Sequence, residues 1–265
     1  MTISSPSGRS VPLVIDHGDY GRAVLLQGQP VPWREVPALA GYLRQVQALL
    51  DPDVAYVDVE AMMLGGLAAR PELCAAMAER TRTGYALRTL LADETELDLV
   101  RVTVTTVGDV LRRRVALAVP SPVRFLASAH EVAGTARAEV SEDNADSASL
   151  YLAEWLGRLG GCPIEMVLLD ARASAALAGV EVEVEERLET YTALTNVAAH
   201  LGWSIGLRTS TGIEFPPDSE IGQVVPDGFW DGEATTLDSA ATVRLTHIPA
   251  DAHPESVLER LPALG

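Results

Sequence analysis

The chain has 265 residues, and 48% of them are hydrophobic, which is enough to fill a large core and is not the composition of a disordered protein. Its 37 acidic and 20 basic residues leave a net charge of −17, which repels nucleic acids and anionic membranes and excludes both as expected partners. The two cysteines, Cys74 and Cys162, lie far apart without a CxxC pattern, so we expect free thiols and a cytoplasmic location.

The first ten residues, MTISSPSGRS, are polar and lack the apolar core of a signal peptide. We therefore expect a disordered tail over 1–10 and a single α/β domain over 11–265. No apolar run approaches the roughly 20 residues that a membrane-spanning helix requires. We also find no internal repeat or linker that would divide the domain.

Strand-like and helix-like segments alternate along the chain. Apolar runs rich in β-branched residues predict strands over 11–16, 54–60, 99–107, 114–120, 164–170, 203–209, 222–226 and 242–248. Helical spacing and capping residues predict helices over 35–50, 71–91, 121–134, 142–161, 184–202 and 254–264. Most of the strands are continuous apolar runs, as in a parallel sheet that is buried on both faces.

Eight parallel strands are the number that closes a (β/α)8 barrel of the TIM type, and this is the predicted fold. We expect the N-terminal half to be irregular, because no helix separates the predicted strands 99–107 and 114–120. An open, doubly wound parallel sheet would produce a similar pattern and is the alternative.

The candidate catalytic residues come from one rule: in both folds, ligands bind at the carboxyl ends of the strands. Asp170 ends a dry strand, which would raise its pKa and suit it to proton transfer, although pairing with Arg172 is an equal alternative. His247 is expected to be an acid or base, or else a core histidine. Arg208 is expected to hold a substrate carboxylate, or else to pair with a neighbouring acid.

Other polar and aromatic residues near the strand ends are expected to bind the substrate. They are His17, Tyr20, Arg22, Glu60, Ser121, Arg124, Thr209, Ser210 and Trp230. A simple turn would explain Asp16–Asp19 equally well, and Trp230 could instead pack as part of a lid. The acidic run 181–189 is predicted to be the solvated start of a helix. The chain contains no GxGxxG, Walker A, GxSxG or HExxH sequence.

Four segments together resemble the barrel of the uroporphyrinogen decarboxylase and cobalamin-independent methionine synthase superfamily. They are VALAVPSPVRFLASA, EDNADSASLYLAEWLGRLGGCPIEMVLLD, WSIGLRTSTG and THIPADAHPESVLERL, and they span roughly the C-terminal two thirds of the chain. The resemblance implies a barrel whose decarboxylase branch uses arginines to hold substrate carboxylates and needs no metal. In the methyl-transferring branch, a His-x-Cys pair binds zinc where this chain has Leu207-Arg208-Thr209.

The leading hypothesis is a decarboxylase-like lyase or isomerase without a metal or cofactor. It would act on a small carboxylated or polyketide-like metabolite, in biosynthesis. A second hypothesis is a methyltransferase related to cobalamin-independent methionine synthase, with zinc held by His17, Glu60, Asp170 and His247. A third is a barrel that binds a metabolite without catalysis. The expected partner in each case is a small molecule, and a homodimer is left open.

Overall fold

The computed structural model describes residues 3–137 and 139–265. The strands are β1 (Leu13–Asp16), β2 (Ala55–Asp58), β3 (Val115–Pro120), β4 (Glu139–Val140), β5 (Ile164–Asp170), β6 (Glu181–Val182), β7 (Ser204–Arg208), β8 (Ile213–Glu214), β9 (Gly222–Val225) and β10 (Val243–His247). The α-helices are α1 (Gly18–Val24), α2 (Val36–Leu50), α3 (Val59–Leu64), α4 (Pro71–Ala78), α5 (Tyr85–Ala92), α6 (Glu94–Leu111), α7 (Pro122–Val132), α8 (Glu142–Gly157), α9 (Thr192–Leu201) and α10 (Pro254–Arg260).

Hydrogen bonding joins the main strands into two sheets. The larger has the order β2-β3-β5-β7-β8, the smaller has the order β1-β10-β9, and β4 pairs with β6. Every pairing is parallel except that of β7 with β8. The two sheets meet where the backbone N–H of Asp53 donates to the oxygen of Leu13 at 3.0 Å. The protein is therefore an α/β structure with mainly parallel sheets, and the described ladders form two main sheets and one two-stranded sheet instead of one closed ring.

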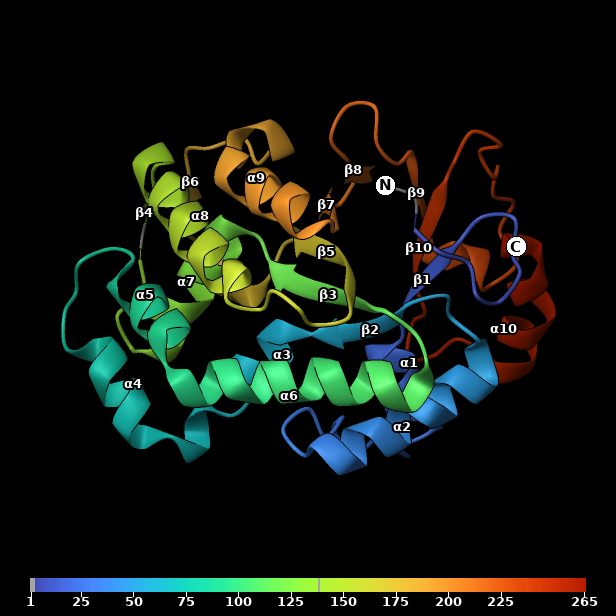
Figure 1. The fold of residues 1–265 in the computed structure, drawn as a ribbon, viewed down its shortest axis with the longest axis horizontal. Helices are drawn as coiled ribbons and strands as arrows, with labels where there is room; N and C mark the ends of the chain where they lie inside the picture. Colours follow the sequence, from blue (N-terminus) through green and yellow to red (C-terminus); the bar gives the residue numbers. More distant parts are fainter. Residues whose placement is uncertain (1–2, 138) are drawn as a thin grey trace.

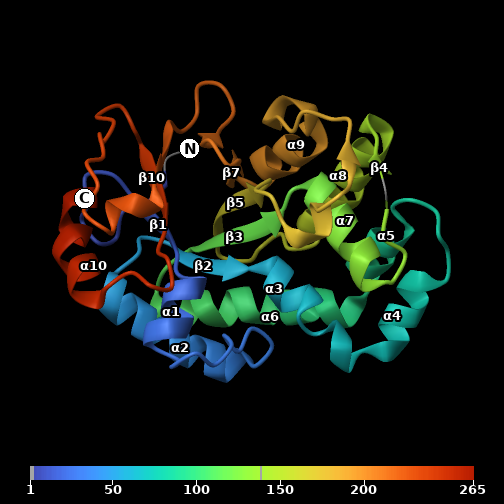
Figure 2. The same ribbon diagram turned by 180° about the vertical axis from the view of Figure 1, so that it is seen from behind.

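Both faces of the larger sheet are buried, as the continuous apolar strands predict. Helices α2, α6, α8 and α9 all pack against one face, with α2 and α6 below the sheet and α8 and α9 above it in the view of Figure 1 (Figures 1 and 2). On β3, Val115, Leu117 and Val119 belong to the cluster packed against the helices. Their neighbours Ala116 and Ala118 face a second cluster, to which β1, β5 and β10 of both sheets contribute. The sheets therefore share one interior core.

The predicted strand 99–107 is wrong, because these residues lie within helix α6. The β-branched content of the segment favoured a strand. However, Val100, Val104 and Val107 recur at helical spacing and all three are buried. The side chain of Asp93 accepts a hydrogen bond from the Glu96 N–H at 3.0 Å and caps the helix. Helix α6 is thus the last helix of the connection between β2 and β3. The predicted strand 99–107 is itself this helix, so no further helix separates it from the strand at 114–120.

The expected disordered tail is also corrected for its described part, residues 3–10. Ile3 is only 3% exposed and packs in the interior cluster. The hydroxyl of Ser7 donates to Oδ1 of Asp53 at 2.6 Å, and the hydroxyl of Ser5 reaches the same oxygen at 3.1 Å. Residues 1–2 lie outside the described part. Apolar and hydrogen-bonding contacts to distant segments, which composition does not reveal, hold this stretch in place.

The predicted helix 184–202 begins only at Thr192, as α9. The acidic run before it is therefore loop and short 3-10 helix (Leu188–Thr190) and not the first turn of an α-helix. Glu186 turns inward and accepts a hydrogen bond from the Tyr191 hydroxyl at 2.7 Å. Burial raises the pKa of Glu186. In the described part of the chain, no helix combines the length and apolar character needed to cross a membrane.

Candidate functional site

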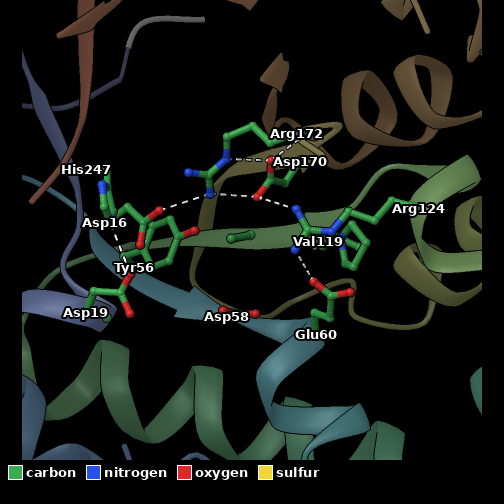
Figure 3. A pocket seen from close by; sticks show the side chains of 13 residues that line it. Asp16, Asp19, Tyr56, Asp58, Glu60, Val119, Arg124, Asp170, Arg172 and His247 are labelled. Atoms are coloured by element: carbon green, nitrogen blue, oxygen red, sulfur yellow. Dashed lines mark hydrogen bonds and ion pairs between the residues drawn. The ribbon is translucent and has the colours of Figure 1, made fainter. Parts of the chain in front are cut away.

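Charged side chains end most of the long parallel strands, and the sheets bring them to one edge. Strands β1, β2, β5, β7 and β10 end at Asp16, Asp58, Asp170, Arg208 and His247. Asp170 is in register with Arg208, and Asp16 is in register with His247. A cavity of about 200 Å³ opens at this edge. It is lined by Asp16, Gly18, Asp19, Tyr56, Asp58, Glu60, Ala118, Val119, Pro120, Arg124, Asp170, Arg172 and His247 (Figure 3).

A chain of ion pairs crosses the wall of the cavity from β1 to β7. Oδ2 of Asp16 lies 3.1 Å from Nη1 of Arg208 and 3.1 Å from Nη2 of Arg172. Arg172 also donates to Asp170, from Nε at 2.9 Å and from Nη2 at 2.7 Å. Figure 3 shows the Arg172 guanidinium between the two aspartates. The carboxylate that Arg208 holds in this structure is therefore Asp16, from the protein itself.

Arg124, on α7, continues the same network towards α3. Its Nη1 lies 3.0 Å from Oδ2 of Asp170, and its Nη2 pairs with Oε2 of Glu60. The hydroxyl of Ser128 donates to the other oxygen of Glu60 at 2.8 Å. Each of the three arginines at this edge, Arg124, Arg172 and Arg208, thus has a carboxylate partner.

The expectation of a raised pKa at Asp170 is wrong. Burial alone would raise it, since the residue is only 7% exposed. The hydrogen bonds and charge of Arg172, with the charge of Arg124, outweigh burial and hold the pKa of Asp170 below its usual range. Asp170 is therefore a permanent carboxylate at neutral pH. The alternative role, pairing with Arg172, is the observed one.

Asp58 has the raised pKa that we expected of Asp170. Burial raises its pKa from 3.8 to about 7; the charges of Asp16 and Glu60 add to this, and Arg124 acts in the opposite direction. One oxygen of Asp58 accepts from the Ala61 N–H at 2.9 Å and caps α3. The strand-end rule points to Asp58 as well. The sequence signal that separates it from Asp170 is the arginine two residues after Asp170, which Asp58 lacks.

Tyr56 is a site residue that the sequence analysis did not identify. It precedes Asp58 by two positions on β2, so both side chains lie on the same face of the strand. The side chain is only 4% exposed, and it lines the cavity. Figure 3 draws no hydrogen bond between its hydroxyl and the other residues that line the cavity, and burial raises its pKa well above the usual value. Tyr56 is therefore a neutral hydroxyl facing the cavity at neutral pH.

His247 lies at the mouth of the cavity between two acids. Its Nδ1 is 3.0 Å from Oδ2 of Asp227, and its Nε2 is 3.4 Å from Oδ2 of Asp19. The indole N–H of Trp230 donates to the backbone oxygen of His247 at 2.8 Å. The ring of Trp230 is buried against Phe229, with centroids 5.0 Å apart. Trp230 thus packs against Phe229 and positions the strand, which is the alternative that the sequence left open for it, and it does not line the cavity.

Several other residues expected to bind substrate do not line the cavity: His17, Tyr20, Arg22, Ser121, Thr209 and Ser210. His17 is buried, with Nδ1 2.9 Å from the Tyr42 hydroxyl, and burial lowers its pKa to about 4. Ser121 caps α7 by accepting from the Arg124 N–H at 3.3 Å.

The remaining four of these residues differ in exposure. Tyr20 is buried in the core, Arg22 and Ser210 are exposed, and the Thr209 hydroxyl lies 3.1 Å from that of Thr211. Tyr20 and Arg22 lie on α1, Thr209 and Ser210 lie in the loop after β7, and none of the four lines the cavity. Of the residues expected to bind substrate, the cavity therefore brings together Glu60 and Arg124, with the expected catalytic residues Asp170 and His247.

Comparisons of the chain with protein-family models, with curated proteins and with solved structures find no match. Within residues 3–137 and 139–265, no group of three or more His, Cys, Asp and Glu side chains is arranged to hold a metal ion.

Proposed function

We propose that the protein is an enzyme that moves protons to and from a small polar metabolite, as a lyase or isomerase whose proton transfers are made by its own side chains. The observation that carries this proposal is Asp58, a carboxyl group with a pKa of about 7 facing a cavity of about 200 Å³. An acid-base catalyst works best when its pKa is close to the working pH.

The contrast between two carboxyl groups supports a division of roles. Asp58 changes its protonation state near neutral pH, whereas Asp170 stays ionised between Arg124 and Arg172. Environments that push two pKa values apart are typical of acid-base sites. Asp58 is the proposed proton carrier. Asp170 is a positioning residue, because it fixes the two guanidinium groups.

His247 is the proposed second proton carrier, at the mouth of the cavity. The pairing of one ring nitrogen with Asp227 fixes the orientation of the imidazole, which leaves the other nitrogen directed towards Asp19 and the cavity. Arg208 would act through Asp16, its partner in the structure, and would therefore position Asp16 and Arg172 instead of binding the substrate directly.

We extend the proposal to the fold family. The two sheets would be parts of one barrel of the uroporphyrinogen decarboxylase and cobalamin-independent methionine synthase type. The parallel strand order, the contact between β1 and β2, and the interior core common to both sheets support this. Reaction type does not follow from such a fold, so the proton-transfer proposal depends on Asp58 and not on the resemblance.

The test is solvent deuterium exchange, which does not require the substrate to be known. The purified chain is incubated in D2O with pooled small polar metabolites, and mass spectrometry identifies compounds that gain carbon-bound deuterium. We expect incorporation by the wild type, its loss with Asp58→Asn, and no change with Asp146→Asn, an exposed aspartate on α8. Equal incorporation by wild type and Asp58→Asn, or none by the wild type, would contradict the proposal.

A further inference from the structure

The charges lining the cavity do not balance. Its carboxyl groups are Asp16, Asp19, Asp58, Glu60 and Asp170, and its guanidinium groups are Arg124 and Arg172; the imidazole of His247 also lines it, between Asp19 and Asp227. Arg208 adds a third guanidinium behind Asp16. Because all three guanidinium groups already have carboxylate partners, the cavity has an excess of acid.

The acidic excess lies on one side. Arg124, Asp170 and Arg172 form one wall, and Asp58 lies on the opposite side with Tyr56 between (Figure 3). Asp58 makes no ion pair with any described cation, although the charges of Asp16 and Glu60 act on it. Once Asp58 is ionised, a positive group is the missing partner on this side.

Tyr56 is an independent sign of a ligand at the same place. It is a buried side chain whose hydroxyl faces the cavity, and Figure 3 draws no hydrogen bond between this hydroxyl and the other residues that line the cavity. Polar groups in protein interiors are nearly always hydrogen-bonded, so this hydroxyl pairs with water or with a ligand group that enters the cavity. A hydroxyl oxygen accepts from N–H donors, and the face of a tyrosine ring attracts cations.

The ion pairs of the cavity wall would affect an anionic ligand and a cationic ligand differently. An anion would find only the donors that the carboxylates leave free, such as Nη1 of Arg172, and it would lie beside Asp16 and Asp170, whose charges repel it. An ammonium group would leave every ion pair intact and would supply the missing positive charge. Electrostatics in a partly buried site therefore favour the cation.

We infer that the metabolite carries a protonated amine, and that its ammonium group binds beside Asp58 and Tyr56. This inference rests on the proposed function, because it takes the same cavity as the substrate site. The ammonium group donates to the free oxygen of Asp58 and to the Tyr56 hydroxyl. Its charge favours the ionised form of Asp58, so the substrate itself would convert Asp58 into a base.

The experiment compares three probes of equal size: n-propylammonium, propionate and n-propanol. Each is titrated into the full chain, and binding is followed by NMR chemical shifts. We expect n-propylammonium to bind at least about tenfold more tightly than the other two. Its affinity should rise between pH 6 and pH 8 as Asp58 ionises. Asp58→Asn should lower it by at least about tenfold, Tyr56→Phe should lower it by a smaller factor, and Asp146→Asn should leave it unchanged.

Tighter binding of propionate, or equal binding of all three probes, would overturn the inference. The deuterium-exchange and binding experiments together distinguish failure of the amine inference from failure of the proposed function. If deuterium exchange depends on Asp58 but the exchanging metabolite has no amine, only the amine inference fails. If n-propylammonium binds in an Asp58-dependent way but no metabolite exchanges, the amine site stands and proton transfer fails.

Discussion

Replacing Asp58 by asparagine should stabilise the protein at neutral and alkaline pH. An unfolded aspartate ionises near pH 3.8, whereas folded Asp58 retains its proton up to about pH 7. Between these values the unfolded chain releases a proton that the folded chain keeps, so the free energy of unfolding falls as the pH rises. Asparagine cannot ionise and avoids this loss, and its side-chain oxygen can still accept from the Ala61 N–H.

The size of the effect follows from the two pKa values. At about 1.4 kcal/mol per pKa unit, the interval from 3.8 to about 7 corresponds to a ceiling of about 4 kcal/mol. Water in the cavity screens part of this charge. We therefore expect the advantage of Asp58→Asn over the wild type to grow by about 2 kcal/mol between pH 5 and pH 8.

The assay is equilibrium urea unfolding at intervals across this pH range, followed by tryptophan fluorescence. Other titrating groups are common to both proteins and cancel in the difference. Asp146→Asn is the matched control and should show a difference that does not vary with pH. A constant or shrinking advantage for Asp58→Asn would refute the reasoning. Together with lost deuterium exchange, the gain would show that the site trades stability for activity.

Two further predictions concern buried groups outside the cavity. Glu96 is fully buried and accepts from Arg34 at 2.7 and 2.9 Å and from Arg70 at 3.0 Å, so Glu96→Gln should lower the free energy of unfolding by about 3 kcal/mol. Urea unfolding measures this loss, and a change below about 1 kcal/mol would contradict it. Burial lowers the pKa of His17 to about 4, so the folded chain takes up its proton later than the unfolded chain, and stability falls as the pH drops from 6.5 towards 4. His17→Gln should weaken this acid dependence; a curve parallel to that of the wild type would contradict the prediction.

Patterns along the chain predicted most of the main strands, because a strand buried on both faces reads as an uninterrupted apolar run. The segments ending at Asp16, Asp170, Arg208 and His247 were predicted in this way. The strand prediction for 99–107 was wrong because its β-branched residues fit the pattern of a strand and also recur at helical spacing. The cap at Asp93 and the packing of α6 decided in favour of the helix.

The edge of the sheet that carries the candidate site followed from the sequence as well. Parallel strands place all their carboxyl ends together, so the polar residue after each apolar run comes to the same edge. This reasoning needs only chain direction and the boundaries of the strands.

Only the tertiary structure decided which of these groups can change its charge. Asp58 and Asp170 both end apolar strands, yet their pKa values move in opposite directions. The difference comes from Arg124 and Arg172, which lie within hydrogen-bonding distance of Asp170 and make no ion pair with Asp58. Electrostatic energies depend on distances of a few ångströms between side chains, and those distances arise only once the chain has folded.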